Sequence, residues 1–349
     1  MIRKVTAAFA VFVLILNIVG AFVVIANGQS SQSANPLVVM LPASDAVVIG
    51  DGKRFFTEAP KLLGANQKLL GELLAKLDEV QAKTGIDLRK FETFAAGASI
   101  AKSEGHGQKI APVVIARGSV SSAQVIEAAK KVSEGKAKEE SVNGRTMFVV
   151  SAKDAMELAK KHAPVAVNNQ KVQDKVAQHT MDDLAIAAAD GNTVVFGYAS
   201  RVRETLEAKS KVNGELLTLL AKKPAGIANF AAKVPGGMGD LLPLDNDDLG
   251  MIVNSIKAVY GSADIAEGQA VVNLTAVTEK ASQAEDLKGT LDGLKVLGKT
   301  MLGASKAADK QLYARLIDSV KVSSAGNELS LDLAIPQSDI DAIVAILKK

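Results

Sequence analysis

The chain has 349 residues, 48% of them hydrophobic, and its 41 basic and 38 acidic residues leave a net charge of +3. Basic and acidic residues are interspersed, which argues against a nucleic-acid-binding protein, because such proteins carry a clustered basic face. The chain lacks cysteine, which excludes disulfides, thiol catalysis and cysteine-ligated metals, and its lack of tryptophan disfavours aromatic platforms for sugars or bases.

The first 28 residues have the pattern of an export signal. Arg3 and Lys4 precede an apolar run over residues 5–26, and polar residues follow from Gly28. Basic residues stay on the cytoplasmic side, so we expect the rest of the chain outside the cytoplasm. A helix of that length reaches about 33 Å, enough to cross a bilayer of about 30 Å. The segment therefore fits either a cleaved signal peptide, giving a periplasmic or secreted protein, or a retained anchor in the inner membrane.

A polar linker over residues 29–36 leads into a predicted first lobe over residues 37–212. β-branched residues predict a strand at Ala46–Gly50 that ends in a turn at Asp51 and Gly52, and leucines at helical spacing predict one helix over residues 62–80. Capping residues predict helices after Ser121 and Ser151, and a further helix covers residues 201–209. The remaining predicted strands of this lobe cover residues 91–100, 110–120, 146–150, 184–189 and 193–198.

A second lobe over residues 213–349 repeats these patterns loosely. Its predicted strands cover residues 226–232, 251–260, 268–277, 319–324 and 328–335, and amphipathic helices are predicted over 216–221, 281–301 and 312–320 and after Ser338. Hairpins interspersed with helices are typical of an α+β fold. We therefore expect mainly antiparallel sheets flanked by amphipathic helices in two similar lobes.

Several segments of the first lobe occur in an order known from other proteins. They are Leu41–Val48 before a leucine-rich helix, Thr84–Asp87, Pro112–Gly118 before a helix, and Val142–Arg145 before a strand. This order, over roughly residues 40–210, resembles a group of uncharacterised exported bacterial envelope proteins of unknown function. The resemblance implies an envelope location and an α+β architecture, and it transfers no active-site residue.

Histidine and acidic residues give two weak candidate sites. His179 lies in an irregular stretch just before Asp182 and Asp183, where an irregular loop with paired acids could line a ligand-binding site. The sequence from Asp245 begins like a calcium loop, but the twelfth position is Ile256 where a bidentate glutamate is required. The loop therefore offers at most a weak cation site, whose ligands would be Asp245, Asp247 and Asp248.

No catalytic motif accompanies the export pattern. The chain has neither a nucleophile elbow nor a phosphate-binding loop nor a dinucleotide fingerprint, so we expect a non-catalytic envelope protein without a cofactor. Its partner would be an envelope protein or a small ligand, or its role would be structural. Two alternatives stay open: a periplasmic hydrolase whose catalytic residues meet only on folding, and a carrier with helices covering a sheet over an apolar cavity.

Overall fold

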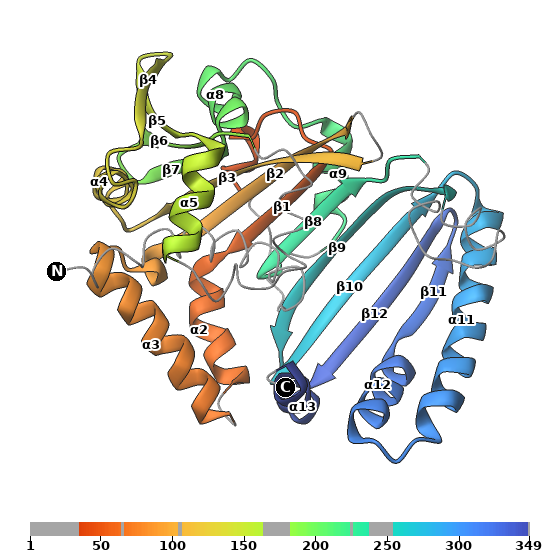
Figure 1. Cartoon of the computed structure of the whole chain (residues 1–349). Coiled ribbons are helices and arrows are strands. Elements are labelled where there is room, and N and C mark those ends of the chain that lie inside the picture. Colours follow the sequence, from red (N-terminus) through yellow and green to blue (C-terminus); the bar gives the residue numbers. More distant parts are fainter. Residues whose placement is uncertain are drawn as a thin grey trace. The chain divides into compact units, whose positions relative to one another are not determined.

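The computed structural model describes residues 35–63, 66–103, 107–162, 182–223, 226–236 and 254–347. These residues form two compact units, which Figure 1 colours by position in the chain. The first unit contains residues 35–56 and 68–214, and the second contains the segment from Thr57 to Gln67 and the chain from Glu215 onward. Helix α2 (Gly52–Leu62) begins in the first unit and ends in the second.

The first unit is built on an antiparallel sheet with the strand order β1-β2-β3-β7-β6-β5-β4. Asn143 and Gly144 both have positive φ and make the tight turn between the last two strands of this order. The strands are β1 (Ala46–Asp51), β2 (Phe91–Ser103), β3 (Gly107–Gly118), β4 (Lys138–Val142), β5 (Arg145–Val150), β6 (Leu184–Asp190) and β7 (Thr193–Tyr198).

The helices of the first unit begin where the sequence supplies capping side chains. The Ser121 hydroxyl accepts a hydrogen bond from the Gln124 amide, and the Ser151 hydroxyl accepts one from the Asp154 amide at 3.1 Å, so both predicted helix starts are confirmed. The elements are 3-10 helices η2 (Val38–Met40) and η3 (Leu88–Lys90), and α3 (Gln67–Thr84), α4 (Ser122–Val132), α5 (Ala152–His162) and α8 (Ala199–Glu207).

The second unit has its own antiparallel strands in the order β8-β9-β10-β12-β11. Helices α11 and α12 pack against each other and against this sheet, and Ala284, Leu287 and Leu312 on them are buried. The elements are α9 (Gly214–Ala221), β8 (Ala228–Lys233), β9 (Ile256–Ala266), β10 (Gln269–Thr278), α11 (Ala281–Gly303), α12 (Ala308–Ser319), β11 (Lys321–Ala325), β12 (Glu328–Pro336) and α13 (Gln337–Leu347).

The α+β class with antiparallel sheets is confirmed, and two local predictions are wrong. Asp51 and Gly52 form no turn, because the Asp51 carboxylate accepts a hydrogen bond from the Arg54 amide at 2.8 Å and so caps α2. The predicted helix over residues 62–80 is instead two helices, α2 and α3. Strand β4 was not predicted, because it is an exposed edge strand and lacks alternating apolar residues.

The predicted export segment, residues 1–28, lies outside the described residues. Within the part of the chain that the structure describes, no helix has the length and hydrophobicity needed to cross a bilayer.

Candidate functional site

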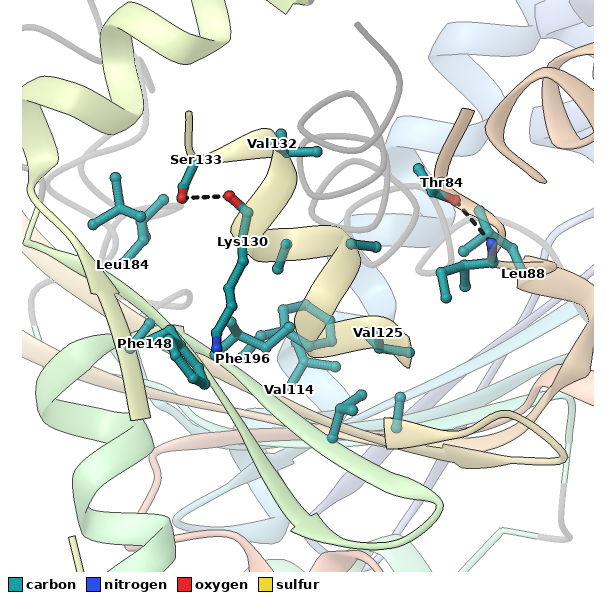
Figure 2. A pocket seen from close by; sticks show the side chains of 18 of the residues that line it. Thr84, Leu88, Val114, Val125, Lys130, Val132, Ser133, Phe148, Leu184 and Phe196 are labelled. Atoms are coloured by element: carbon teal, nitrogen blue, oxygen red, sulfur yellow. Dashed lines mark hydrogen bonds between the residues drawn. The ribbon is translucent and has the colours of Figure 1, made fainter. Parts of the chain in front are cut away.

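The first unit contains a partly open cavity of about 210 Å³ between its sheet and helices α4 and α5 (Figure 2). The side chains that line it are almost all apolar. They come from helices α2, α4 and α5, from the last residue of α3, from the segments between α3 and β2 and between α4 and β4, and from strands β2, β3, β5, β6 and β7. A sheet and covering helices thus enclose an apolar space, as the carrier alternative predicts.

Strand pairing sets the apolar side chains of the sheet in a straight row. Val114 of β3 pairs with Phe196 of β7, Phe196 pairs with Ile186 of β6, and Ile186 pairs with Phe148 of β5. Directly paired residues of neighbouring strands point to the same face of a sheet, so all four side chains face the cavity. We call these four residues the apolar row. It crosses four strands and forms the sheet wall of the cavity.

The strand order continues the apolar row to a charged residue. Phe148 pairs directly with Glu139 on the edge strand β4, so a carboxylate follows the last aromatic ring on the same face of the sheet. Glu139 does not line the cavity, and its side chain is 62% exposed. The row therefore runs from the middle of the sheet to a polar, solvent-accessible edge.

Helix α4 covers the apolar row with a face of small side chains. Val125, Ala128, Ala129 and Val132 recur at intervals of three, one and three residues, which places them on one side of the helix, and all four line the cavity. The neighbouring α5 adds Ala155 and Leu158. Because alanine extends only one carbon from the backbone, it leaves space between helix and sheet that larger residues would fill.

Gly50 on β1 also shapes this layer. A Cβ atom placed on Gly50 would lie 1.9 Å from Cζ of Phe94, a cavity-lining residue of β2 that pairs directly with it. The absence of a side chain at residue 50 therefore gives the Phe94 ring its position beside the cavity.

The described residues that line the cavity include two with hydroxyl groups, and both hydroxyls already have hydrogen-bond partners. Thr84 Oγ1 donates to the Val80 carbonyl at 2.8 Å and accepts from the Ile86 amide at 3.0 Å. Ser133 Oγ donates to the Lys130 carbonyl at 2.8 Å, as the dashed line in Figure 2 shows. Since both hydroxyls satisfy neighbouring backbone groups, neither is arranged as an activated nucleophile.

Lys130 is the charged residue among the described residues that line the cavity. Figure 2 shows its side chain running from α4 towards the sheet, with Nζ beside the Phe148 ring, and Nζ lies 4.3 Å from the ring centroid. Nζ also lies 3.2 Å from a Glu139 oxygen and 3.4 Å from a Glu127 oxygen. The hydrogen bond to Glu139 and these nearby carboxylates raise the pKa of Lys130, although desolvation opposes the rise. The amine is therefore a cation at neutral pH.

The acidic candidates next to His179 do not line the cavity. His179 itself lies outside the described residues. Asp182 is half-buried, and Asp183 is exposed. The Asp183 carboxylate accepts a hydrogen bond from the Ala152 amide at 2.9 Å, at the first residue of α5, and its carbonyl accepts one from the Ala199 amide at 2.8 Å. Asp183 thus supports the starts of two helices, and neither aspartate lines the cavity.

The candidate cation loop, with Asp245, Asp247 and Asp248, also lies outside the described residues. Within the ranges that the structure describes, no group of three or more histidine, aspartate and glutamate side chains is placed to hold a metal ion.

Sequence reasoning placed apolar faces on these helices and strands but assigned no functional role to a residue of the cavity. Two local signals were present: apolar residues at alternate positions of β3 and β7, and the spacing of Val125, Ala129 and Val132 on α4. Neither signal distinguishes a cavity wall from a filled core. Lys130 was missed because a lysine near the end of a helix is usually a solvated residue.

Comparisons with known proteins find similar solved structures but no matching family. No protein-family model matches the chain, and no curated protein matches it. The fold is similar to three crystal structures of TP0453: crystal form I (TM-score 0.43, 9% identity), form III (0.43, 8%) and form IV (0.42, 10%). The alignments cover 90%, 89% and 89% of this chain and 98%, 98% and 97% of the TP0453 chains, respectively. A likeness at this level says nothing about function.

Proposed function

We propose that this chain is a non-catalytic exported envelope protein that binds an apolar ligand in the cavity of its first unit. The observation that carries the proposal is the cavity itself, with the apolar row on one wall and α4 and α5 on the other. Among the described residues that line it, none is a histidine, aspartate or glutamate. Lys130, the ionisable residue among them, is a cation at neutral pH and so does not act as a general base, which supports binding over hydrolysis there.

The size of the cavity matches one hydrocarbon chain or one small ring system. An engineered protein cavity of about 150 Å³ lined by leucine, isoleucine and phenylalanine stays dry and binds benzene, which has six carbon atoms. By the same proportion, 210 Å³ accommodates about eight carbon atoms. Burying about eight methylene groups at about 0.8 kcal/mol each corresponds to a Kd on the order of 20 μM.

The energetics of packing also favour an occupant. A closed void of 210 Å³ would cost at most about 5 kcal/mol, at about 24 cal/mol per Å³. Most proteins have a total stability of only about 5–15 kcal/mol, so even the smaller cost of a partly open cavity is a sizeable fraction of it. A ligand that fills it restores dispersion contacts along the apolar row.

The N-terminal pattern supports the proposed location. Arg3, Lys4 and the apolar run over residues 5–26 predict export, so the ligand would be met in the aqueous space outside the cytoplasm or at the membrane surface. An apolar molecule in that space needs a protein that shields it from water. Binding without catalysis is sufficient for this role.

Native mass spectrometry of the protein purified from its own host's envelope tests this proposal. The N-terminal residue distinguishes a cleaved chain from one that keeps Arg3 and Lys4, and any retained mass identifies a bound ligand. The delipidated protein is then titrated by calorimetry with ethylbenzene, a neutral apolar molecule of eight carbon atoms. We expect one binding site and a negative heat-capacity change on binding, the mark of apolar burial. Absence of both retained mass and ethylbenzene binding would refute the proposed function.

A further inference from the structure

The cavity has an apolar end and a charged end. Val114 and Phe196 lie in the middle of the sheet, whereas Phe148 lies next to the edge strand that carries Glu139. Lys130 reaches Phe148 from the opposite wall, so the cation and the last ring of the apolar row meet at this end. A molecule that fills the space along the row would have one of its ends beside Lys130 Nζ.

Lys130 differs from an ordinary surface lysine in the direction of its side chain. Its carbon chain lines the cavity and its ammonium group points towards the sheet, while its side chain remains 36% exposed. Glu127 and Glu139 accompany it, but they are 61% and 62% exposed and line no part of the cavity. A ligand head group in the cavity would therefore meet the ammonium before it met either carboxylate.

We infer that the ligand is a single-chain amphiphile with an anionic head group, whose hydrocarbon chain follows the apolar row and whose head group pairs with Lys130. This inference rests on the proposed function, because it names the ligand class for the same cavity. A single chain fits, since 210 Å³ holds about eight carbon atoms. A small number of polar groups in an otherwise apolar pocket usually fixes the orientation of the ligand.

The acidic neighbours of Lys130 set how strongly it can bind an anion. Glu139 at 3.2 Å and Glu127 at 3.4 Å both compete with a head group for the same ammonium. Both carboxylates are largely exposed, so water solvates them when a ligand anion displaces them, and the exchange costs little. Removing one competing carboxylate should therefore strengthen anion binding, and removing the ammonium should weaken it.

Binding of decanoate, decanol and decylammonium to the delipidated full-length protein tests the inference. The three probes share the hydrocarbon chain and differ in head-group charge. The Lys130→Met variant keeps an unbranched side chain of similar length without the charge, and Lys131→Met on the exposed side of α4 is the matched control. Glu139→Gln, at an exposed edge-strand position, supplies a second test that does not alter α4.

We expect the native protein to bind decanoate more tightly than decanol and decanol more tightly than decylammonium. Lys130→Met should weaken decanoate binding about tenfold, because the carboxylate loses a hydrogen bond to a charged group. The same variant should change decanol binding by less than about threefold. Glu139→Gln should strengthen decanoate binding by about threefold. Lys131→Met should leave all three affinities unchanged.

Two results separate failure of this inference from failure of the proposed function. If decanol and ethylbenzene bind but decanoate binds no more tightly than decanol, the anionic head group is refuted and the apolar cavity stands. The same conclusion follows if Lys130→Met weakens the binding of all three probes equally. If none of the probes binds to the native protein, both proposals fall. Tighter binding of decylammonium than of decanoate would assign the charged end to the carboxylates and overturn the inference.

Discussion

Filling the cavity from the sheet side should abolish most ligand binding without unfolding the protein. Ala116 on β3 is buried, lines the cavity, and pairs with Phe94 on one side and Val194 on the other. Ala116→Leu adds three carbon atoms on the face that α4 covers. Those atoms would occupy space that the proposed hydrocarbon chain uses.

The expected size of the effect follows from the number of added carbons. Three methylene equivalents at about 0.8 kcal/mol each amount to about 2.4 kcal/mol of displaced ligand contact, which corresponds to a Kd about 50-fold weaker. In the free protein the same three carbons gain a similar burial energy, and overpacking strain of about 1–3 kcal/mol opposes it. The free energy of unfolding should therefore change by less than about 1.5 kcal/mol.

Titration calorimetry with decanol measures the affinity, and urea unfolding measures the stability. Ala111→Leu is the matched control, because Ala111 lies on the same strand at an odd-numbered position and does not line the cavity. The cavity is refuted as the binding site if the Ala116→Leu protein has the same urea midpoint of unfolding as the native protein and still binds decanol within about twofold of the native affinity.

Three further predictions concern stability and titration. Arg201→Met should lower the free energy of unfolding by about 2–3 kcal/mol in urea titrations, because the buried guanidinium donates to the Ala43 carbonyl at 2.6 Å and that acceptor would lose its partner. Ser151→Ala should cost about 1 kcal/mol in the same assay through loss of the α5 cap, and unchanged stability would argue against the cap. Burial and the hydrogen bond to Glu328 raise the pKa of Tyr260 from 10.0 to about 12, so the folded state favours the protonated phenol. The contribution of this raised pKa to the free energy of unfolding should be complete below pH 10 and lost as pH rises from 10 to about 12. In an ultraviolet titration, the Tyr260→Phe variant should lack the tyrosine ionisation that occurs at the highest pH in the native protein.

Local residue patterns were enough for the fold class and many helix and strand positions. Apolar residues identified the two strands that form β6 and β7, and the serines at 121 and 151 marked two helix starts. These signals are readable because each depends on residues within a few positions of one another. Where a local signal had two structural uses, as at Asp51, only the folded chain selected between a turn and a helix cap.

The candidate site depended on contacts that no local pattern specifies. Residue 114 pairs with residue 196, and Phe148 pairs with Glu139 only because β4 occupies the sheet edge. Asp183, a candidate ligand-binding residue, instead bonds the first amide of α5, 31 residues earlier. By itself the sequence determined the export pattern, the α+β class and the apolar faces, because those follow from composition and short-range periodicity. Tertiary structure alone decided that these faces leave a space between them and that Lys130 enters it, because strand order and helix placement bring together distant residues.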